Sequence, residues 1–340
     1  MKKKISLKDI AERVGVSTAL VSYVLNNQKE GRIGKAVSQR IRETALELNY
    51  RTNHIARSLK TNKTNTIGLI VADISNAFSS SLARIIENEA ERNNYTVLFG
   101  SSDENTERSF KLINILLNHQ VDGFIISPSE NSEKEILFLQ ENEIPFVMID
   151  RYYPDVEASY IAIDNHDAAY RAVVHLIEQR NKRIGIVSYK TPLFHLQQRK
   201  SGYIKALADH NLPVNDELIQ EVGVHTTQDD VEKAIHDLLA LPEPVDAILF
   251  ASNTISTFGL KYLNGLALKI PEELCIISFD ESDASELFYA PLSHIKQPLK
   301  EMGELATRIL LENMGKNASV QKINLSASLV IRKSSMRLGL

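Results

Sequence analysis

Polar side chains that could bind a small molecule stand directly after several apolar runs of this chain. Asp150, Asp164 and Asp280 each close a run of strand length, and Asn253 follows another. A carboxylate accepts hydrogen bonds from hydroxyl groups, and a carboxamide both donates and accepts them. Because ligands of open parallel sheets bind beyond the carboxyl ends of the strands, these residues predict a site for a polyol or sugar-like molecule.

The second kind of chemistry belongs to a basic amino-terminal segment. The 340-residue chain has 39 Lys and Arg against 43 Asp and Glu, a net charge of −4. Residues 1–64 hold 14 of the basic and 5 of the acidic side chains, a net of +9, so residues 65–340 carry −13. A basic segment on an acidic body predicts that only this segment contacts a polyanion such as DNA.

Motifs of catalysis are absent from the sequence. It has no nucleophile elbow, phosphate-binding glycine loop, metal-spaced histidine pair or dinucleotide fingerprint. Cys275 is the only cysteine, which excludes an intramolecular disulfide and a cysteine-based zinc site. We therefore expect a protein that is not an enzyme and has neither a cofactor nor a metal.

The sequence also bears on location. No apolar run approaches the length that spans a bilayer, and residues 6–12 are polar where a signal peptide would be apolar. The expectation is a cytoplasmic protein that makes no membrane contact.

Short helices are expected to position the basic residues. Ser6 and Asp9 predict a helix start, and Gly15 ends that helix. Ser17 caps a second helix with an apolar inner face, and a third helix follows Gly34. The outer face of the second helix carries small and polar side chains, at Thr18, Ala19, Ser22 and Tyr23. A helix pair of this kind reads DNA in the major groove.

The remaining chain alternates apolar runs with amphipathic stretches of helical length, such as residues 78–93, 166–179 and 254–268. Strands are expected at residues 67–71, 96–100, 123–127, 146–150, 160–164, 183–188, 247–252, 275–280 and 294–297, and the stretch 322–333 could close a sheet. This alternation predicts parallel sheets with helices on both faces. Since the strands are too many for one small sheet, the expected fold class is a small all-α helix-turn-helix head plus an α/β core of two doubly wound parallel-sheet lobes.

Nine segments together carry a family resemblance. The six longer ones are residues 6–26 (SLKDIAERVGVSTALVSYVLN), 53–61 (NHIARSLKT), 66–78 (TIGLIVADISNAF), 121–128 (VDGFIISP), 199–203 (RKSGY) and 295–298 (IKQP). The three short ones are residues 150–151 (DR), 164–165 (DN) and 279–281 (FDE). In colinear order, over nearly the whole chain, they resemble the lactose-repressor/galactose-repressor (LacI/GalR) family of bacterial transcription regulators. The resemblance implies a homodimer that binds a palindromic double-stranded DNA operator, and a core like periplasmic sugar-binding proteins that holds a small-molecule effector.

The resemblance also implies domain boundaries. The helix-turn-helix domain is expected at residues 1–52, the hinge helix and linker at 53–64, and the core at 65–340. Within the core, the amino-terminal lobe is expected to comprise about residues 65–162 plus 294–322. The carboxy-terminal lobe is then expected to comprise about residues 163–293 plus 323–340.

For DNA, the resemblance places base reading on the outer face of the second helix. Tyr23 departs from the family, which usually carries Arg there, and Tyr cannot make the paired contact to guanine that Arg makes. The loop 27–31 is longer than the family norm. Leu59 matches the hinge leucine that wedges between base steps. The other DNA contacts expected are Ser6, Asn26, Arg32, Asn53, His54, Ala56 and Arg57.

For the effector, the resemblance implies binding by Asp73, Phe78, Asp150, Arg199, His225, Asn253 and Asp280. The Arg199 guanidinium can bind two adjacent hydroxyl oxygens. His225 stands where many relatives have Trp or Phe, so stacking is expected from Phe78, Tyr152 or Phe194.

Several alternatives stay open at this point. Asp150 and Asp280 could simply cap turns, and Arg199 could form a surface salt bridge. The regulator could depend on a co-repressor and use a nucleobase or a protein partner. A sugar-binding protein without a DNA role is disfavoured by the basic head.

Overall fold

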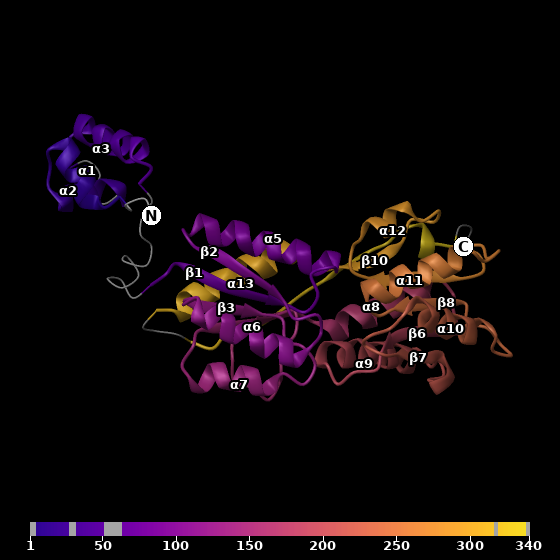
Figure 1. Ribbon diagram of the computed structural model, residues 1–340. Helices are drawn as coiled ribbons and strands as arrows, with labels where there is room; N and C mark the ends of the chain where they lie inside the picture. The colour runs from indigo at the N-terminus through magenta and orange to yellow at the C-terminus, as the bar shows by residue number, and fades with distance from the viewer. Residues whose placement is uncertain (1–4, 27–31, 51–62, 316–318, 338–340) are drawn as a thin grey trace. The chain divides into compact units, whose positions relative to one another are not determined.

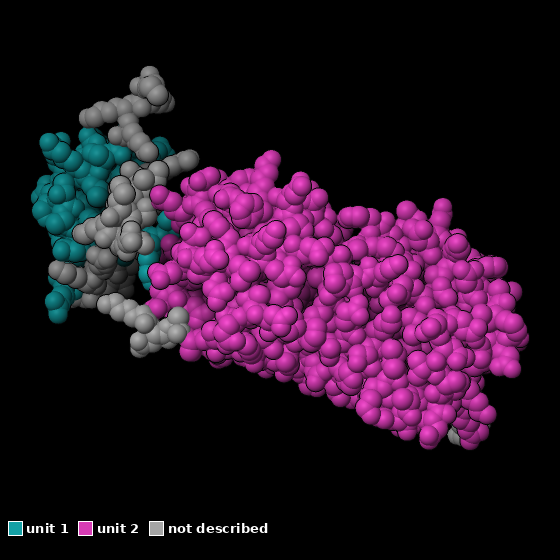
Figure 2. All heavy atoms as spheres, turned by 90° about the horizontal axis from the view of Figure 1, so that it is seen from below, with its two compact units in different colours: residues 1–64 teal, residues 65–340 magenta. Residues whose placement is uncertain are grey.

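The computed structural model describes residues 5–26, 32–50, 63–315 and 319–337, and the chain divides into two compact units, residues 1–64 and 65–340 (Figure 1, Figure 2). The first unit contains the helices α1 (Leu7–Val14), α2 (Thr18–Leu25) and α3 (Lys35–Glu47). Their shared core is small and apolar, with Ile10, Val21 and Ile41 among its buried members.

Local hydrogen bonds define the ends of the first two helices. Ser6 and Asp9 form a capping box at the start of α1, and Gly15 ends α1 with a φ of 76° while its N–H donates to Ala11 O. The Ser17 hydroxyl accepts from Leu20 N at 3.2 Å and caps α2. Arg40 of α3 donates to Val14 O at 2.8 Å, which ties the third helix to the end of the first.

The second unit contains two six-stranded sheets of matching strand order. The first sheet runs β11-β5-β4-β3-β1-β2 and the second β12-β10-β9-β8-β6-β7. The strands of the first are β1 (Thr66–Val71), β2 (Thr96–Ser101), β3 (Gly123–Ile126), β4 (Phe146–Ile149), β5 (Tyr160–Ile163) and β11 (Lys322–Leu325). Those of the second are β6 (Ile184–Tyr189), β7 (Ile219–Val222), β8 (Ala247–Phe250), β9 (Cys275–Phe279), β10 (Ser293–Lys296) and β12 (Ser328–Val330). All pairings are parallel except β10 with β12.

Helices cover both faces of each sheet, so each lobe is a three-layered, doubly wound unit (Figure 1). In the first lobe, α5 (Ala77–Arg92) and α13 (Leu299–Asn313) pack on one face, and α6 (Thr106–Asn118) and α7 (Glu133–Glu141) on the other. In the second lobe the corresponding pairs are α8 (Asn165–Glu178) with α9 (Phe194–Asp209), and α10 (Gln228–Leu239) with α11 (Asn253–Asn264). The short helix α12 (Asp283–Leu287) and two 3₁₀ turns, Asp216–Leu218 and Lys333–Ser335, complete the unit.

The chain passes between the lobes three times, and two of the expected lobe boundaries are wrong. β10 pairs with β9 and belongs to the second sheet, so the return to the first lobe begins with α13 and not at residue 294. β11 pairs with β5 along its whole length, so the last crossing lies at residues 326–327 and not at 323. The stretch 322–333 is therefore divided between the two sheets.

One strand was not expected from the sequence. β7 forms the edge of the second sheet, and only the last of its four residues is buried. Its composition, Ile-Gln-Glu-Val, therefore lacks the continuous apolar run that marks the central strands. The expected boundary between residues 52 and 53, and the expected hinge up to residue 62, lie outside the described residues.

Candidate ligand cleft and DNA-binding face

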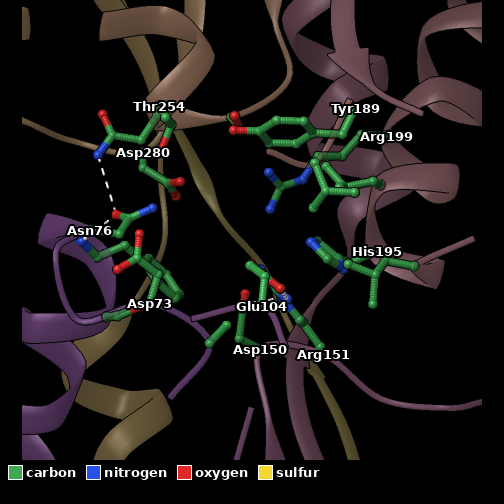
Figure 3. Close-up of a pocket in the computed structure, with 18 of the residues that line it drawn as sticks. Asp73, Asn76, Glu104, Asp150, Arg151, Tyr189, His195, Arg199, Thr254 and Asp280 are labelled. Carbon is green, nitrogen blue, oxygen red and sulfur yellow. Dashed lines mark hydrogen bonds and ion pairs between the residues drawn. The ribbon is translucent and has the colours of Figure 1, made fainter. Parts of the chain in front are cut away.

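A cleft of about 240 Å³ lies where the carboxyl ends of the strands of the two sheets face each other (Figure 3). Six of the seven residues expected to bind the effector line it: Asp73, Phe78, Asp150, Arg199, Asn253 and Asp280. In Figure 3 the Arg199 guanidinium and the His195 imidazole extend from one side toward the Asp280 carboxylate, and Asp150 and Arg151 lie below them. The structure thus brings together residues from both lobes that are far apart in the sequence.

Asp150 and Asp280 occupy equivalent places in the two lobes. Each directly follows the third strand from one end of its sheet, β4 or β9, and each has a left-handed backbone, with φ of 68° and 69°. The Asp150 N–H donates to Ile161 O at 2.8 Å, and the Asp280 N–H donates to Ile295 O at 2.9 Å. A left-handed residue other than glycine is uncommon, and such backbone geometry is concentrated at binding sites.

The Arg199 side chain is held rigidly in the cleft and is only 3% exposed. Its Nε donates to Asn165 Oδ1 and its Nη1 to Ala251 O, both at 2.7 Å. The guanidinium also stacks on the Phe279 ring, with Cζ 3.8 Å from the centroid. A charged fork fixed in this way meets a ligand without losing further rotamer freedom.

Burial and charge have opposite effects on the two aspartates. Burial raises the pKa of Asp150 to about 6, against the opposing effects of Arg151 and then Arg199. Burial likewise raises the pKa of Asp280, while Arg199 and the hydrogen bond from Gln297 lower it. Because Arg199 interacts electrostatically with both carboxylates, it couples an acidic group of the first lobe to one of the second.

Arg151 is engaged within the first lobe. Its Nη1 and Nη2 donate to the two carboxylate oxygens of Glu104, each at 2.7 Å, and its Nε lies 3.6 Å from Asp150 Oδ2. A bidentate pair of this kind satisfies most of the donor capacity of the guanidinium. Arg199 is therefore the cation of the cleft that remains for a ligand.

The lobes also contact each other directly beside the cleft. Asn253 Nδ2 of the second lobe donates to Asn76 Oδ1 of the first at 3.4 Å, and Thr191 Oγ1 donates to Glu130 Oε2 at 2.7 Å. Asn76 caps α5, since the same Oδ1 accepts from Phe78 N. These bonds join helix and loop ends that have to separate if the cleft opens.

One expected effector contact, His225, is corrected by the structure, and of the three aromatic residues that could stack on a ligand the structure favours one. His225 is exposed on a turn and does not line the cleft, although its neighbours Val224 and Thr226 do. Tyr152 stacks on Tyr160 with 3.8 Å between ring centroids and packs edge-on against Phe194, so these three rings pack against one another and not against the cleft. Among the three aromatic residues expected to stack on a ligand, Phe78 is the one that lines the cleft.

Sequence reasoning missed other lining residues, above all His195, Glu104 and Gln297. His195 lies one helical turn before Arg199, so the two side chains share a face of α9, and this spacing was a usable signal. Glu104 lies in a loop with no such periodicity. Asp73 does line the cleft, but its carboxylate also accepts from the Ser75 N–H and hydroxyl, each at 2.8 Å, which is the turn-capping role.

On the first unit, the outer face of α2 presents the expected base-reading residues. Thr18 and Ala19 are exposed, and Ser22 and Tyr23 are half-buried. Asn26 Nδ2 donates to Ser22 O at 2.8 Å and to Ser22 Oγ at 3.3 Å, so it closes the end of the helix and orients Ser22. Ser6 is committed to the cap of α1, and Arg32 is exposed. The expected contacts at Asn53, His54, Ala56, Arg57 and Leu59, and the loop 27–31, lie outside the described residues.

The described part of the chain offers neither a metal site nor a membrane-spanning helix. No group of three or more His, Cys, Asp or Glu side chains there is placed to hold a metal ion. None of the helices in those same ranges is long and apolar enough to cross a membrane.

Comparison with known proteins gives consistent matches along the chain. Residues 6–53 match the family described as bacterial regulatory proteins, lacI family, and residues 173–335 match a periplasmic binding protein-like domain. The transcriptional repressor CytR of Escherichia coli K12 is 32% identical over 336 residues, covering 98% of this chain and 97% of CytR. Catabolite control protein A of Priestia megaterium is 32% identical over 314 residues, covering 92% and 93%.

The fold is shared with solved structures. The lac repressor dimer bound to operator and the anti-inducer ONPF aligns with a TM-score of 0.86, covering 98% of this chain and 100% of that one at 20% identity. The relatives matched over most of the chain, the family of the head and the fold of the two-lobed core all indicate the same class of protein. The chain therefore belongs to the LacI family of bacterial regulatory proteins and is a DNA-binding transcriptional regulator.

Proposed function

We propose that this regulator binds a near-palindromic operator as a homodimer, and that a sugar-like effector in the interlobe cleft changes its affinity for DNA. The observation that carries the proposal is the grouping of Asp150, Arg199 and Asp280, three buried charged groups contributed by both lobes. Charged groups are almost never fully buried unless they are paired or bind something. Here they lie at the carboxyl ends of the strands, where ligands of such sheets bind.

For the DNA end, the proposal assigns base reading to Thr18, Ala19, Ser22 and Tyr23 on α2, in the major groove. Ala19 presents a methyl group to a thymine methyl, and Ser22 can donate or accept a hydrogen bond. Residues 53–64 act as a hinge, with Leu59 as the wedge in the minor groove.

For the signal, the effector must bind one arrangement of the lobes more tightly than another, since a ligand with equal affinity for both shifts nothing. A molecule that contacts Asp150 in the first lobe and Arg199 in the second gains contacts only when the cleft is closed. Closure also preserves the direct bonds Asn253–Asn76 and Thr191–Glu130.

The test is a DNA-binding titration of the full-length protein with and without a panel of unphosphorylated mono- and disaccharides. One sugar is expected to change the dissociation constant for operator DNA. Arg199→Lys removes the planar fork and is expected to weaken the sugar response by at least about tenfold, since loss of one partner in a buried charged hydrogen bond costs roughly 2–5 kcal/mol. The matched control is Arg180→Lys, at an exposed position outside the cleft.

Both variants are expected to keep wild-type DNA affinity in the absence of sugar. An unchanged sugar response in Arg199→Lys would contradict the assignment of the cleft. DNA affinity that responds to added cellular protein and to no small molecule would instead identify a co-repressor-dependent regulator.

A further inference from the structure

Four buried polar atoms of the cleft have no hydrogen-bond partner among the residues that the structure describes. One is the donor Arg151 Nε, which lies 3.6 Å from the Asp150 carboxylate. The other three are His195 Nδ1, Asn253 Oδ1 and Gln297 Oε1, whose residues line the cleft and are 5%, 7% and 5% exposed. Buried polar atoms in native proteins are nearly always paired, so exceptions grouped around one cavity indicate groups that a ligand satisfies.

The orientation of the two carboxamides follows from their neighbours. Gln297 Nε2 donates to Asp280 Oδ1 at 2.7 Å, so the Gln297 oxygen is the atom left over. Asn253 Nδ2 faces Asn76 Oδ1, which already accepts from the Phe78 N–H, so the Asn253 oxygen is likewise left over. Both unsatisfied atoms are acceptors, and a ligand hydroxyl in the cleft can donate to each of them.

The third unpartnered atom is His195 Nδ1, which accepts a hydrogen bond when the ring hydrogen is on Nε2. Burial lowers the pKa of the imidazole well below its usual value, and the neighbouring Arg151 and Arg199 lower it further. The ring is therefore neutral, and a neutral imidazole has one nitrogen that donates and one that accepts. Figure 3 shows the His195 ring on the same side of the cleft as Arg199, directed toward its centre.

The charges of the cleft act against an anionic ligand. Asp150 and Asp280 are both buried there, and Glu104 occupies Arg151. Arg151 is shared between Glu104 and Asp150, and two nitrogens of Arg199 already donate to protein oxygens, so these two cations face the four carboxylates of Asp73, Glu104, Asp150 and Asp280. A phosphate or carboxylate group would therefore meet unsatisfied acceptors and like charges at close range, where the low dielectric strengthens repulsion.

We propose that this cleft selects an uncharged, hydroxyl-rich molecule over its phosphorylated or carboxylated derivatives, and that His195 determines this specificity by accepting a hydrogen bond from a ligand hydroxyl at Nδ1. The proposal rests on the proposed function in taking the cleft as the effector site, and it defines the class of effector. A site built to receive hydroxyl donors discriminates strongly, because a ligand without them leaves the buried acceptors unpaired.

The first test measures binding by the full-length protein, by calorimetry and thermal shift, to matched sets of compounds. The sets comprise uncharged monosaccharides, disaccharides, polyols and nucleosides, together with the corresponding sugar phosphates, uronic acids and nucleotides. At least one uncharged compound is expected to bind, and to bind at least about tenfold more tightly than its anionic derivative, a difference of about 1.4 kcal/mol. The proposal is overturned if an anionic member binds as tightly as its uncharged parent, or if no uncharged member binds.

The second test asks which atom of His195 acts, using the uncharged compound that binds. His195→Asn places an amide oxygen near the position of Nδ1, whereas His195→Gln reaches toward Nε2. His195→Ala is expected to weaken binding by roughly tenfold to a hundredfold, as expected for an unpaired buried group. His195→Asn is expected to restore affinity to within about threefold of wild type, less than 1 kcal/mol, and His195→Gln is not.

Two controls separate this proposal from the function on which it rests. His225→Asn, at an exposed histidine outside the cleft, is expected to leave binding unchanged. Far-UV circular dichroism and thermal unfolding of every variant report whether it is folded. The role of Nδ1 would be overturned if His195→Ala bound the ligand as tightly as the wild type, or if affinity were restored by His195→Gln and not by His195→Asn. The proposed function itself would be contradicted if the wild-type protein failed to bind operator DNA.

Discussion

Glu135 is a buried carboxyl side chain of α7 that lies outside the cleft. It is 4% exposed, and its Oε2 accepts from the Ser109 hydroxyl at 2.6 Å, while its Oε1 has no partner among the described residues. Burial raises the pKa of Glu135 to about 7, against the lowering effect of the bond from Ser109. A folded-state pKa above the unfolded value means that the native state binds more protons, so stability falls as pH rises from about 4.5 to about 7.

Glu135→Gln is expected to remove this loss of stability. The amide oxygen can still accept from Ser109, and no charge has to be buried. At pH 8 the free energy of unfolding is expected to rise by about 3 kcal/mol, with no gain below pH 4.5, because each unit of pKa shift corresponds to about 1.4 kcal/mol. Urea denaturation at several pH values measures this. Glu133→Gln on the same helix, at an exposed position, is the control, and equal effects of the two substitutions would contradict the account.

Asp150 permits a second prediction at this scale, for the protein without effector. Its pKa is also raised, to about 6, so ionised Asp150 is a destabilising group above that pH. Asp150→Asn is expected to increase the unfolding free energy at pH 8 by roughly 1–3 kcal/mol and to weaken effector binding at the same time. If Asp150→Asn instead lowers stability, the accompanying loss of effector binding would follow from a damaged turn, and Asp150 would have only a capping role.

At the scale of elements, the turn between α1 and α2 depends on a left-handed glycine. Gly15 has a φ of 76°, and an added Cβ would meet nothing within 4 Å, so a substitution there tests backbone conformation alone. Gly15→Ala is expected to destabilise the helix pair by about 1–2 kcal/mol. Hydrogen exchange of the full-length protein should then show roughly fivefold to thirtyfold lower protection in the amides of α1 and α2.

The matched control for this prediction is Gly223→Ala in the core. An added Cβ at Gly223 also has open space, but the backbone there does not have a positive φ. Hydrogen exchange around residue 223 is expected to stay unchanged. Equal protection of α1 and α2 in wild type and Gly15→Ala would mean that the turn tolerates a side chain.

The elements also show how far the sequence could predict this structure. Central strands such as β3 and β9 are continuous apolar runs, because both of their faces are covered by helices, and they were predicted within one or two residues. β7 was missed because an edge strand needs no such run. The lobe to which β10 and β11 belong depends on their pairing partners, β9 and β5, and the local composition of a strand does not identify its partner.

The same limit applies to the cleft. Asp150, Asn253 and Asp280 could be predicted because strand ends are visible in the pattern, and parallel strands bring those ends to one edge. Glu104 and Gln297 join the site from a loop and a crossing segment, so their positions depend on tertiary packing. His225 was expected from a family position, and the turn at residues 224–225 leaves its side chain outside.

At the scale of the whole molecule, charge is divided between the two units. Residues 1–64 carry a net of +9 in a chain whose total is −4, so only the head is expected to neutralise DNA phosphates and release the counterions condensed on the DNA. With roughly six to ten phosphate contacts per dimer, operator affinity is expected to fall by about three to five orders of magnitude between 50 and 200 mM salt.

Single basic residues should account for parts of this salt dependence. Arg32→Ala in the head is expected to reduce the slope of log affinity against log salt by about 1 for each phosphate that the variant no longer neutralises. Arg180→Ala, at an exposed position in the core, should leave the slope unchanged. Fluorescence anisotropy with labelled operator DNA measures both slopes, and equal slopes for the two variants would place the phosphate-binding residues elsewhere.

The two lobes repeat one strand order, and each presents an aspartate to the cleft from the equivalent strand end. A ligand held by both lobes therefore acts on the relative position of the two lobes. Linkage requires that DNA binding and effector binding influence each other by the same factor.

The measurement that tests the central claim most directly is selection of bound duplexes from a random DNA pool by the purified full-length protein, followed by sequencing. The account predicts an enriched near-palindrome whose half-sites match the two-fold symmetry of a dimer, with a deformable pyrimidine–purine step at its centre. It also predicts that the uncharged effector changes the yield of that same motif. Recovery of no motif, with or without effector, would contradict the claim that this chain alone is a sequence-specific DNA-binding regulator.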